Sequence, residues 1–567
     1  NRRKVMRWLI KSLVSLILIV ILFIIVIYAF LQTQWGAQKT SEWLTQYSDY
    51  DIRFSGIEHD LTQPEQIVVY DLSINPKQDK TAVLAQSAQL RFNWQFFTMP
   101  SHLQKITLEN GKIILANKIA PLPVSADILQ FKNMQLDSMP TSSTTFTFSA
   151  NKITGGITPW KPTSTDPIGA GHFQFSIADG MIGKNSFNNF IVAGEYQPNR
   201  ILIEKLATQF LNGSLSLSGQ YQDNQWQLND VYLTGLRWQS TKTLEELQQS
   251  LSQSPAMTIK QLNIVDFTAE GKQWAISGFA GQFSQIAWNN SLSLTSGELN
   301  TDDIVYKNQH VTDVIAKLNQ QDNLFNIDNL SLRYEKGLIK LAGQWNSETK
   351  TLNIEDATLS GILYTLPEQW LSFFAKPIEQ DVKSINIKQL SLNQSILIDI
   401  NPLFPFQFTG LTGQLKNLII AKDGQWGLWQ GAATLSADSG TLNGVELRRP
   451  DLTLMTQQDT AIIPQFSAFV DKGIVRGSAA LEQNNNQRLF SLIVNGLNVP
   501  LSLPNNMGWK LSQPTDGTGQ FTLKLKGNLA ADAVIPTLNG TLIGKKDDQT
   551  PIDDRMQDGE IINNLSF

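Results

Sequence analysis

The sequence predicts a mainly β protein, with an N-terminal single transmembrane helix followed by an elongated, curled antiparallel β-sheet and a few short helices. Three observations predict this fold class. One long apolar run lies near the N-terminus, apolar and polar residues alternate through the rest of the chain, and glycines bracket many of the alternating runs. A chain of 567 residues is too long for one ordinary core and suits an architecture that grows strand by strand.

The apolar run "LVSLILIVILFIIVIYAFL", residues 13–31, contains no charged residue. As a helix it would reach about 28 Å, close to the roughly 30 Å of a bilayer's hydrocarbon core. We expect an uncleaved anchor rather than a signal peptide, because signal peptides have apolar regions of about 7–15 residues. Trp35 also occupies the one plausible cleavage site. The anchor residues are Leu13, Leu16, Ile19, Leu22, Ile25 and Tyr28.

Residues 1–12 form a basic flank before the span, and few basic residues follow it. The positive-inside rule therefore predicts a cytoplasmic N-terminus and export of everything after about residue 32. In a bacterium this topology describes a single-pass protein of the inner (plasma) membrane whose bulk lies in the periplasm. The residues of the flank are Arg2, Arg3, Lys4, Arg7 and Lys11.

Residues 51–545 are predicted to form the sheet. "GQFTLKLKGNL", residues 519–529, puts apolar side chains on one face of a strand and polar ones on the other, and "SAQLRFNW", "HFQFSI" and "GSLSLSG" alternate in the same way. In "SAQLRFNW" the predicted alternation runs from Ala88 to Trp94. Glycines between the runs predict tight turns, and hence a long antiparallel meander of about thirty-five strands. The candidate residues lining the apolar face are Leu90, Phe92, Phe173, Phe175, Leu215, Leu217, Phe521, Leu523 and Leu525.

Helical signals are few. Residues 32–50, with "GAQKTSEWLTQYS", predict a juxtamembrane helix; "TLEELQQSL" has Thr243 and Glu246 at capping-box spacing, and "TLPEQWLSFFAKP" repeats that start before Pro377 stops it. Three short helices cannot cover so many one-faced strands, so a second sheet or a molecule that is not protein must do so. Residues 546–567 are rich in acidic residues, and we expect a solvated, flexible tail rather than a divalent cation site.

Catalytic constellations are missing from the sequence. The chain has no cysteine, and its four histidines, His59, His102, His172 and His310, are far apart and lie in strand or turn contexts. Adjacent carboxylates such as Asp302 and Asp303 would point to opposite faces of a strand. We therefore expect no enzyme, no metal site and no cofactor. The net charge of −5 provides no basic field for nucleic acid, and we expect none to bind.

The sequence resembles the AsmA-like family of Gram-negative envelope proteins. The resemblance covers nearly the whole chain, outside the acidic tail. The order and spacing of its pieces carry it: the anchor running into "LQTQWGAQKTSEWLTQYSDYDIRFSGIEH", then "LRFNWQFFTMPSHLQKITLENGKIIL", "LYTLPEQW", "SILIDINPLFPFQFTGLTG", "WGLWQGAATLSADSGTLNGVELRRP" and "GTGQFTLKLKGNL".

The resemblance implies an inner-membrane anchor and an elongated periplasmic sheet curled into a β-groove with an apolar interior. Larger relatives act as bridges for phospholipid moving towards the outer membrane, and the founding member was connected genetically with outer-membrane protein assembly and targeting. No catalytic residues are known in the family, so none are transferred.

Two functions follow as expectations. In the first, the groove binds phospholipid acyl chains and conducts phospholipid between the inner and outer membranes, supporting outer-membrane biogenesis. In the second, the protein is a non-enzymatic factor that influences targeting or assembly of outer-membrane proteins without carrying lipid, with the outer membrane or envelope proteins as partners. The alternation cannot separate an open groove from a closed sandwich core, because both place apolar residues on one face.

Overall fold

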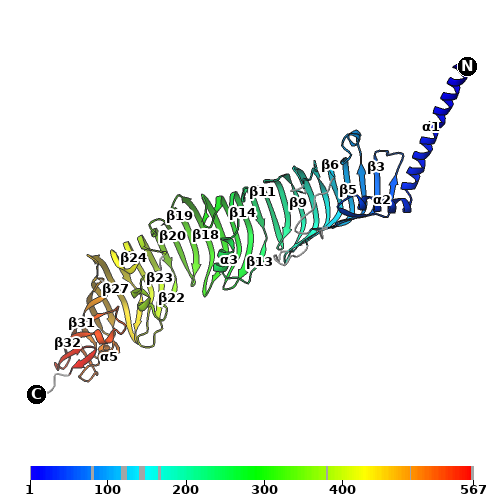
Figure 1. Cartoon of the computed structure of the whole chain (residues 1–567). Helices are drawn as coiled ribbons and strands as arrows, with labels where there is room; N and C mark the ends of the chain where they lie inside the picture. Colours follow the sequence, from blue (N-terminus) through cyan, green and yellow to red (C-terminus); the bar gives the residue numbers. More distant parts are fainter. Residues whose placement is uncertain are drawn as a thin grey trace. The chain divides into compact units, whose positions relative to one another are not determined.

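A computed structural model describes residues 2–77, 82–115, 124–138, 147–163, 166, 168–378, 381–484 and 487–562. The predicted fold class is confirmed: the chain is mainly β, with a long antiparallel sheet, few helices and an N-terminal apolar helix (Figure 1). The chain divides into two compact units. Unit 1 comprises residues 1–269 and 284–292, and unit 2 comprises residues 270–283 and 293–567.

Unit 1 begins with two helices, α1 (Arg2–Leu31) and α2 (Gln34–Gln46). Its strands follow, with one 3-10 turn, η1 (Trp94–Phe97), and one further helix, α3 (Leu244–Leu251). The strands are β1 (Tyr50–Arg53), β2 (Gly56–His59), β3 (Gln66–Pro76), β4 (Ala82–Arg91), β5 (His102–Leu115), β6 (Ser125–Ser138), β7 (Phe148–Thr158), β8 (Gly171–Ile182), β9 (Asn185–Gln197), β10 (Arg200–Phe210), β11 (Gly213–Gln222), β12 (Gln225–Thr234), β13 (Arg237–Gln239) and β14 (Ala256–Gly271).

The unit boundary falls at the end of β14, within β15 (Trp274–Trp288) and in β16 (Leu292–Ser293). The strands of unit 2 are β17 (Ser296–Tyr306), β18 (Gln309–Gln321), β19 (Leu324–Tyr334), β20 (Gly337–Asn346), β21 (Thr351–Ser360), β22 (Leu363–Thr365), β23 (Ser384–Asp399), β24 (Phe406–Lys422), β25 (Gln425–Ser436), β26 (Ser439–Leu442), β27 (Val445–Gln457), β28 (Thr460–Val470), β29 (Gly473–Glu482), β30 (Leu489–Pro500), β31 (Thr518–Asn528), β32 (Asn539–Lys546), β33 (Pro551–Gln557) and β34 (Glu560–Ile562). Its helices are α4 (Trp370–Ala375), α5 (Ser502–Asn506) and the 3-10 turn η2 (Ile535–Thr537).

Most sequence neighbours pair as antiparallel hairpins, as the glycine-bracketed runs predict. The meander is interrupted where β5 pairs with β6, β12 with β14, and both β21 and β22 with β23, because these pairs are parallel. Parallel neighbours need a connection that returns the chain to the same end of the sheet. In two cases the connection contains a short helix, α3 between β12 and β14 and α4 between β21 and β23.

Several strands carry a residue in the left-handed region in mid-strand, which the sequence did not reveal. Asp71, Asn110, Asn133 and Lys152 have φ between 52° and 53° and lie on β3, β5, β6 and β7. The Nδ2 amide of Asn133 donates to Oδ1 of Asn110 at 2.7 Å. Left-handed backbone is uncommon for residues other than glycine, and Asn and Asp adopt it more readily than most. These positions therefore interrupt the regular extended conformation of their strands.

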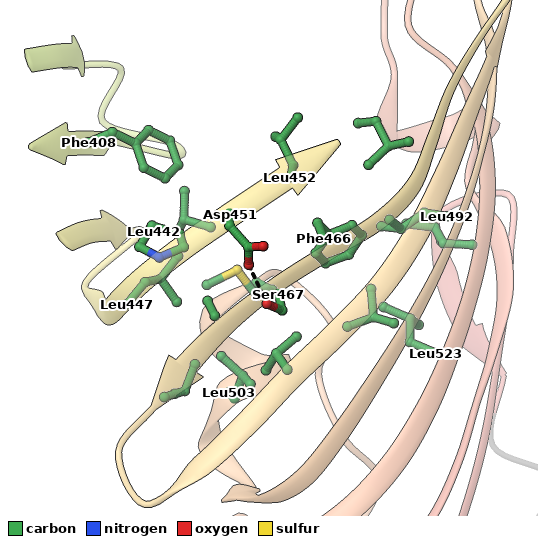
Figure 2. Close-up of a pocket in the computed structure, with 18 of the residues that line it drawn as sticks. Phe408, Leu442, Leu447, Asp451, Leu452, Phe466, Ser467, Leu492, Leu503 and Leu523 are labelled. Atoms are coloured by element: carbon green, nitrogen blue, oxygen red, sulfur yellow. Dashed lines mark hydrogen bonds between the residues drawn. The ribbon is translucent and has the colours of Figure 1, made fainter. Parts of the chain in front are cut away.

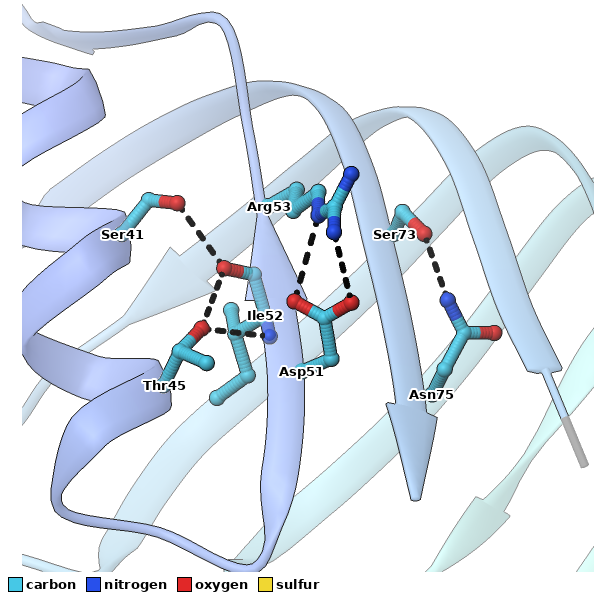
Figure 3. A network of polar contacts seen from close by, with 7 residues as sticks. All are labelled: Ser41, Thr45, Asp51, Ile52, Arg53, Ser73 and Asn75. Carbon is cyan, nitrogen blue, oxygen red and sulfur yellow. Dashed lines mark hydrogen bonds and ion pairs between the residues drawn. The ribbon is translucent and has the colours of Figure 1, made fainter. Parts of the chain in front are cut away.

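The anchor joins the sheet through α2. Ser41 Oγ and Thr45 Oγ1 both donate to the carbonyl oxygen of Ile52 in β1, at 2.8 and 2.9 Å, and Thr45 Oγ1 accepts the Ile52 N–H at 2.9 Å (Figure 3). Gly36 is required at the corner after α1, since a Cβ there would lie 1.9 Å from the carbonyl oxygen of Phe30. Within the predicted range 32–50, the structure has a helix at Gln34–Gln46, and its contacts with Ile52 fix the start of β1.

The other two predicted helices form, but only one as expected. α3 has the predicted capping box, in which Glu246 N–H donates to Thr243 Oγ1 at 3.2 Å and Thr243 N–H to Glu246 Oε2 at 2.9 Å. The prediction that a capping box at Thr365 starts the next helix was wrong. Thr365 ends strand β22, and α4 begins five residues later at Trp370, capped by no side chain.

Two further expectations are corrected. The strand in "SAQLRFNW" ends at Arg91, and Trp94 begins η1 with 87% of its surface exposed. Within the predicted flexible tail, residues 551–562 instead form β33 and β34, and Asp554 is 2% exposed. Its carboxylate accepts the Ser512 N–H at 3.0 Å and also binds the Ser512 hydroxyl, a long-range pairing that makes a buried acid tolerable. Residues 563–567 lie outside the described residues.

Candidate functional site

The apolar face of unit 2 is a continuous row of facing side chains. The strand register pairs one apolar residue or glycine with the next across successive strands, from Leu332 on β19 to Leu542 on β32. The row is Leu332, Ile339, Leu359, Leu392, Gly413, Leu435, Leu452, Phe466, Gly477, Val494, Leu523 and Leu542.

The side chains of this row are half-buried from Leu332 to Leu523. The next residues along the strands, such as Lys340 and Lys524, are exposed on the opposite face. A sandwich core would bury its inner residues between two sheets. The row is therefore an apolar face that remains partly open along its length, which the alternation alone could not establish.

At the C-terminal end of the row the face closes around a cavity of about 620 Å³. Its lining is almost entirely apolar and includes the predicted Phe521, Leu523 and Leu525 of β31. Figure 2 shows Leu442, Leu447, Phe466, Leu492, Leu503 and Leu523 around this space. Asp451 and Ser467, also in the lining, hydrogen-bond to each other, which satisfies two polar groups at this site. The cavity can hold an apolar molecule and offers few polar contacts.

A cap that the sequence did not predict closes this end. Leu501, Leu503 and Trp509, in and around α5, are 0%, 7% and 3% exposed, and Leu542 and Ile552 beneath them are 0% and 1% exposed. They belong to one buried cluster with Phe521. The segment "LSLPNNMGW" contains one Pro and one Gly, which favour a turn and do not indicate a cap.

In unit 1, four of the predicted residues lie together. Leu90, Phe92, Phe173 and Phe175 pack against one buried cluster, which includes Met134 and Phe187. The ring centroids of Phe173 and Phe175 are 6.4 Å apart in a stacked arrangement. Leu215 and Leu217 lie half-buried on β11, where they face Leu233 and Val231 of β12, and they are not members of that cluster.

A second, smaller cavity of about 430 Å³ lies at the ends of β25, β29 and β30 in unit 2. Trp370, Leu371 and Phe374 of α4 cover it, and its lining contains one charged side chain, Arg488. Burial lowers the pKa of the Arg488 guanidinium. Neither Arg488 nor Trp426, which lines the same cavity, was predicted as a site residue, because a lone Arg before a strand has no sequence signature.

The histidines occupy strands, as expected. His59 ends β2, where its Nδ1 lies 2.8 Å from the Tyr28 hydroxyl; His102 is buried at the start of β5, with Nε2 2.8 Å from Asp127 Oδ1. His310 Nε2 lies 2.5 Å from Asp303 Oδ1, and His172 is exposed on β8. Within the part of the chain that the structure describes, no three His, Asp or Glu side chains are grouped to hold a metal ion.

The helix α1 is apolar and exposed. Residues 7–31 are long and apolar enough to cross a membrane, and Leu16, Ile19 and Leu22 are 58%, 62% and 61% exposed. Such a surface is stable in lipid rather than in water. The helix extends through the predicted basic flank to Arg2, so the flank is helical, while the side chains of Arg2, Arg3 and Lys4 lie outside the described part.

The chain is similar to a known protein over nearly its whole length. The chain is 30% identical over 545 residues to "AsmA family protein YicH" of Escherichia coli (strain K12), and the match covers 95% of each chain. No family model matches the chain, and no solved structure matches it.

Proposed function

Because the chain belongs to the AsmA family, we propose that α1 anchors it in the inner membrane and that its apolar sheet face binds the acyl chains of phospholipids. In this proposal the residues before the span lie in the cytoplasm and the sheet lies in the periplasm. The protein then conducts phospholipid between the inner and outer membranes and supports outer-membrane biogenesis.

The observation that carries the proposal is the half-buried apolar row from Leu332 to Leu523. An open apolar face of this length costs free energy in water, at roughly 25 cal/mol per Å² of apolar surface left exposed. An acyl chain removes that surface from water without needing hydrogen bonds. The 620 Å³ cavity at the end of the row offers the same apolar lining in a more enclosed form.

The row runs from strand to strand, across the strand axes, which suits movement of a chain along the sheet. Neighbouring strands are about 4.8 Å apart, so an acyl chain about 15 Å long, half of a bilayer's hydrocarbon core, would cross about three strands. A lipid lying along the row would therefore exchange leucine contacts one strand at a time. No single step would expose the whole chain to water.

Photo-crosslinking of the full chain in its membrane tests the proposal. A photo-crosslinking amino acid at position 523, in the row, should capture phospholipid, and one at position 524, on the opposite face of the same strand, should capture far less. Equal capture from the two positions, or none from position 523, would contradict lipid binding by this face. Capture of outer-membrane proteins instead would favour the assembly factor.

A further inference from the structure

The cavity under α4 contains a cation among aromatic and aliphatic side chains. Arg488 directly precedes β30, and its guanidinium carbon is 5.6 Å from the centroid of the Trp429 ring. Two of its N–H groups donate to backbone oxygens, Nη2 to Trp426 at 2.7 Å and Nη1 to Gln487 at 2.9 Å. Among the described residues, none of its ion pairs or hydrogen bonds involves a carboxylate.

Arg488 is the one charged side chain among the described residues that line this cavity. Lys422 Nζ lies 5.9 Å from the same Trp429 ring and 3.8 Å from the Asp459 carboxylate, so Lys422 already has an anion beside it. Glu482 follows the lining residue Leu481 on β29 and is exposed on the other face of the strand. Among the described residues, Arg488 is thus a partly buried cation with hydrogen-bond donors and no carboxylate partner, which is costly unless an anion binds there.

Arg488 lies an even number of residues before the apolar side chains of β30, so it is on the side of the chain that continues into the apolar face. Phe490, Leu492 and Val494 alternate onto that face of β30, and Leu492 and Val494 line the large cavity. At about 3.3 Å per residue, Leu492 lies roughly 13 Å along the strand from Arg488. One leaflet of acyl chain is about 15 Å thick. A molecule with its anionic end at Arg488 would therefore place its apolar chains against Leu492 and its neighbours.

We infer that the cavity under α4 binds the phosphate of a phospholipid headgroup, with Arg488 as the phosphate ligand and α4 as its apolar cover. This inference rests on the proposed function and adds to it a fixed place for the headgroup. Guanidinium groups suit phosphate oxygens because they donate two parallel hydrogen bonds. The α4 rings of Phe373 and Phe374 pack on Trp426 at 5.8 and 5.5 Å between centroids, and Phe374 lines the cavity.

The test compares two lipids that share their acyl chains and differ in the anionic phosphoglycerol headgroup: phosphatidylglycerol, which has it, and diacylglycerol, which does not. The full chain, purified in detergent with a photo-crosslinking amino acid at position 371 in α4, is given each lipid separately. Position 371 lines the cavity. We expect about tenfold more capture of phosphatidylglycerol, because charge-assisted hydrogen bonds are the stronger class.

Arg488→Gln removes the charge and keeps hydrogen-bonding groups, so its capture ratio should fall to about one. Arg488→Lys keeps the charge but loses the planar fork, and should retain part of the preference, which also covers the case in which Arg488→Gln does not fold. Lys524→Gln, exposed on the opposite face of β31, is the matched control and should keep the full ratio. An unchanged ratio in folded Arg488→Gln would overturn the inference.

Two added arms separate the sources of error. Millimolar inorganic phosphate should leave phosphatidylglycerol capture nearly unchanged; if it abolishes capture, the site takes free phosphate and the headgroup assignment is wrong. Capture from position 523 reports on the row alone. If it persists in every variant while the ratio at position 371 never depends on Arg488, the headgroup site fails and lipid binding by the row stands.

Discussion

The two units use the same alternation of apolar and polar residues but fill the resulting face differently. In unit 1, aromatic side chains occupy the face: Phe187 is 2% exposed and its ring stacks on Phe148 at 6.2 Å between centroids. In unit 2, leucines of β30 and β31 surround a cavity of about 620 Å³. The alternation determines which face is apolar, whereas side-chain volume and the presence of a cap determine whether that face is packed or hollow.

The strand-to-strand connections that contain the short helices also differ between the two units. In unit 1, α3 is held by its own capping box and has no buried residue. In unit 2, α4 lacks a side-chain cap and is held by contacts with the sheet: Trp370 Nε1 donates to Asp399 Oδ2 at 2.9 Å, and two of its rings pack on Trp426. Local sequence can therefore specify α3 alone, while α4 depends on residues distant in the sequence.

The largest expected effect on stability is a difference between substitutions at the closed end of unit 2 and substitutions in the open row. Leu542 and Leu523 are neighbours in that row, and they are 0% exposed and half-buried, respectively. Leu542→Glu buries an unpaired charge and should reduce the local stability of β31–β33 by about 4 kcal/mol or more. Leu523→Glu, beside the cavity, should cost about 1–2 kcal/mol, because its carboxylate can reach water.

Hydrogen exchange of the β31–β33 amides in the full chain, in detergent, measures both changes locally. Lys524→Glu on the exposed face serves as the control and should change protection little. Equal losses of amide protection for Leu542→Glu and Leu523→Glu would mean that the row is as closed at β31 as at β32. The description of the face as open would then be wrong at β31.

A second pair of substitutions tests whether the apolar face is packed in unit 1 and hollow in unit 2. Phe187→Ala in unit 1 removes a ring from a filled cluster and should destabilise β8 and β9 by about 3–4 kcal/mol, since it creates a new cavity. Leu492→Ala in unit 2 only enlarges an existing one and should cost about 1 kcal/mol. The readout is again amide protection of the strands concerned. A loss at Leu492 as large as that at Phe187 would contradict the hollow description of unit 2.

Alternation predicted the strands and their faces because it is a local property. Residues two positions apart, such as Phe173 and Phe175 or Phe521, Leu523 and Leu525, lie on the same face of their strand. Alternation failed to predict structure that depends on residues distant in the sequence. The sequence predicts that Asp554 is a solvated acid, whereas the structure buries it, because Ser512 supplies hydrogen-bond donors from another segment. Arg488 became a candidate ligand because Trp429 and α4 meet around it, and neither lies near it in the sequence. The parallel pairs, likewise, depend on where a connection returns and not on the runs themselves.

The smallest expected effect concerns two threonines that have the same sequence signal. Thr243→Ala removes the acceptor for the Glu246 N–H and should weaken α3 by about 1 kcal/mol. Thr365→Ala changes the end of β22 and should leave α4 unaffected, because α4 starts at Trp370 without a side-chain cap. Amide protection in each helix is the measurement, and Thr243→Ser should restore most of what Thr243→Ala loses. A loss in α4 after Thr365→Ala would show that a capping box forms there in solution, and α4 would then be specified locally, as α3 is.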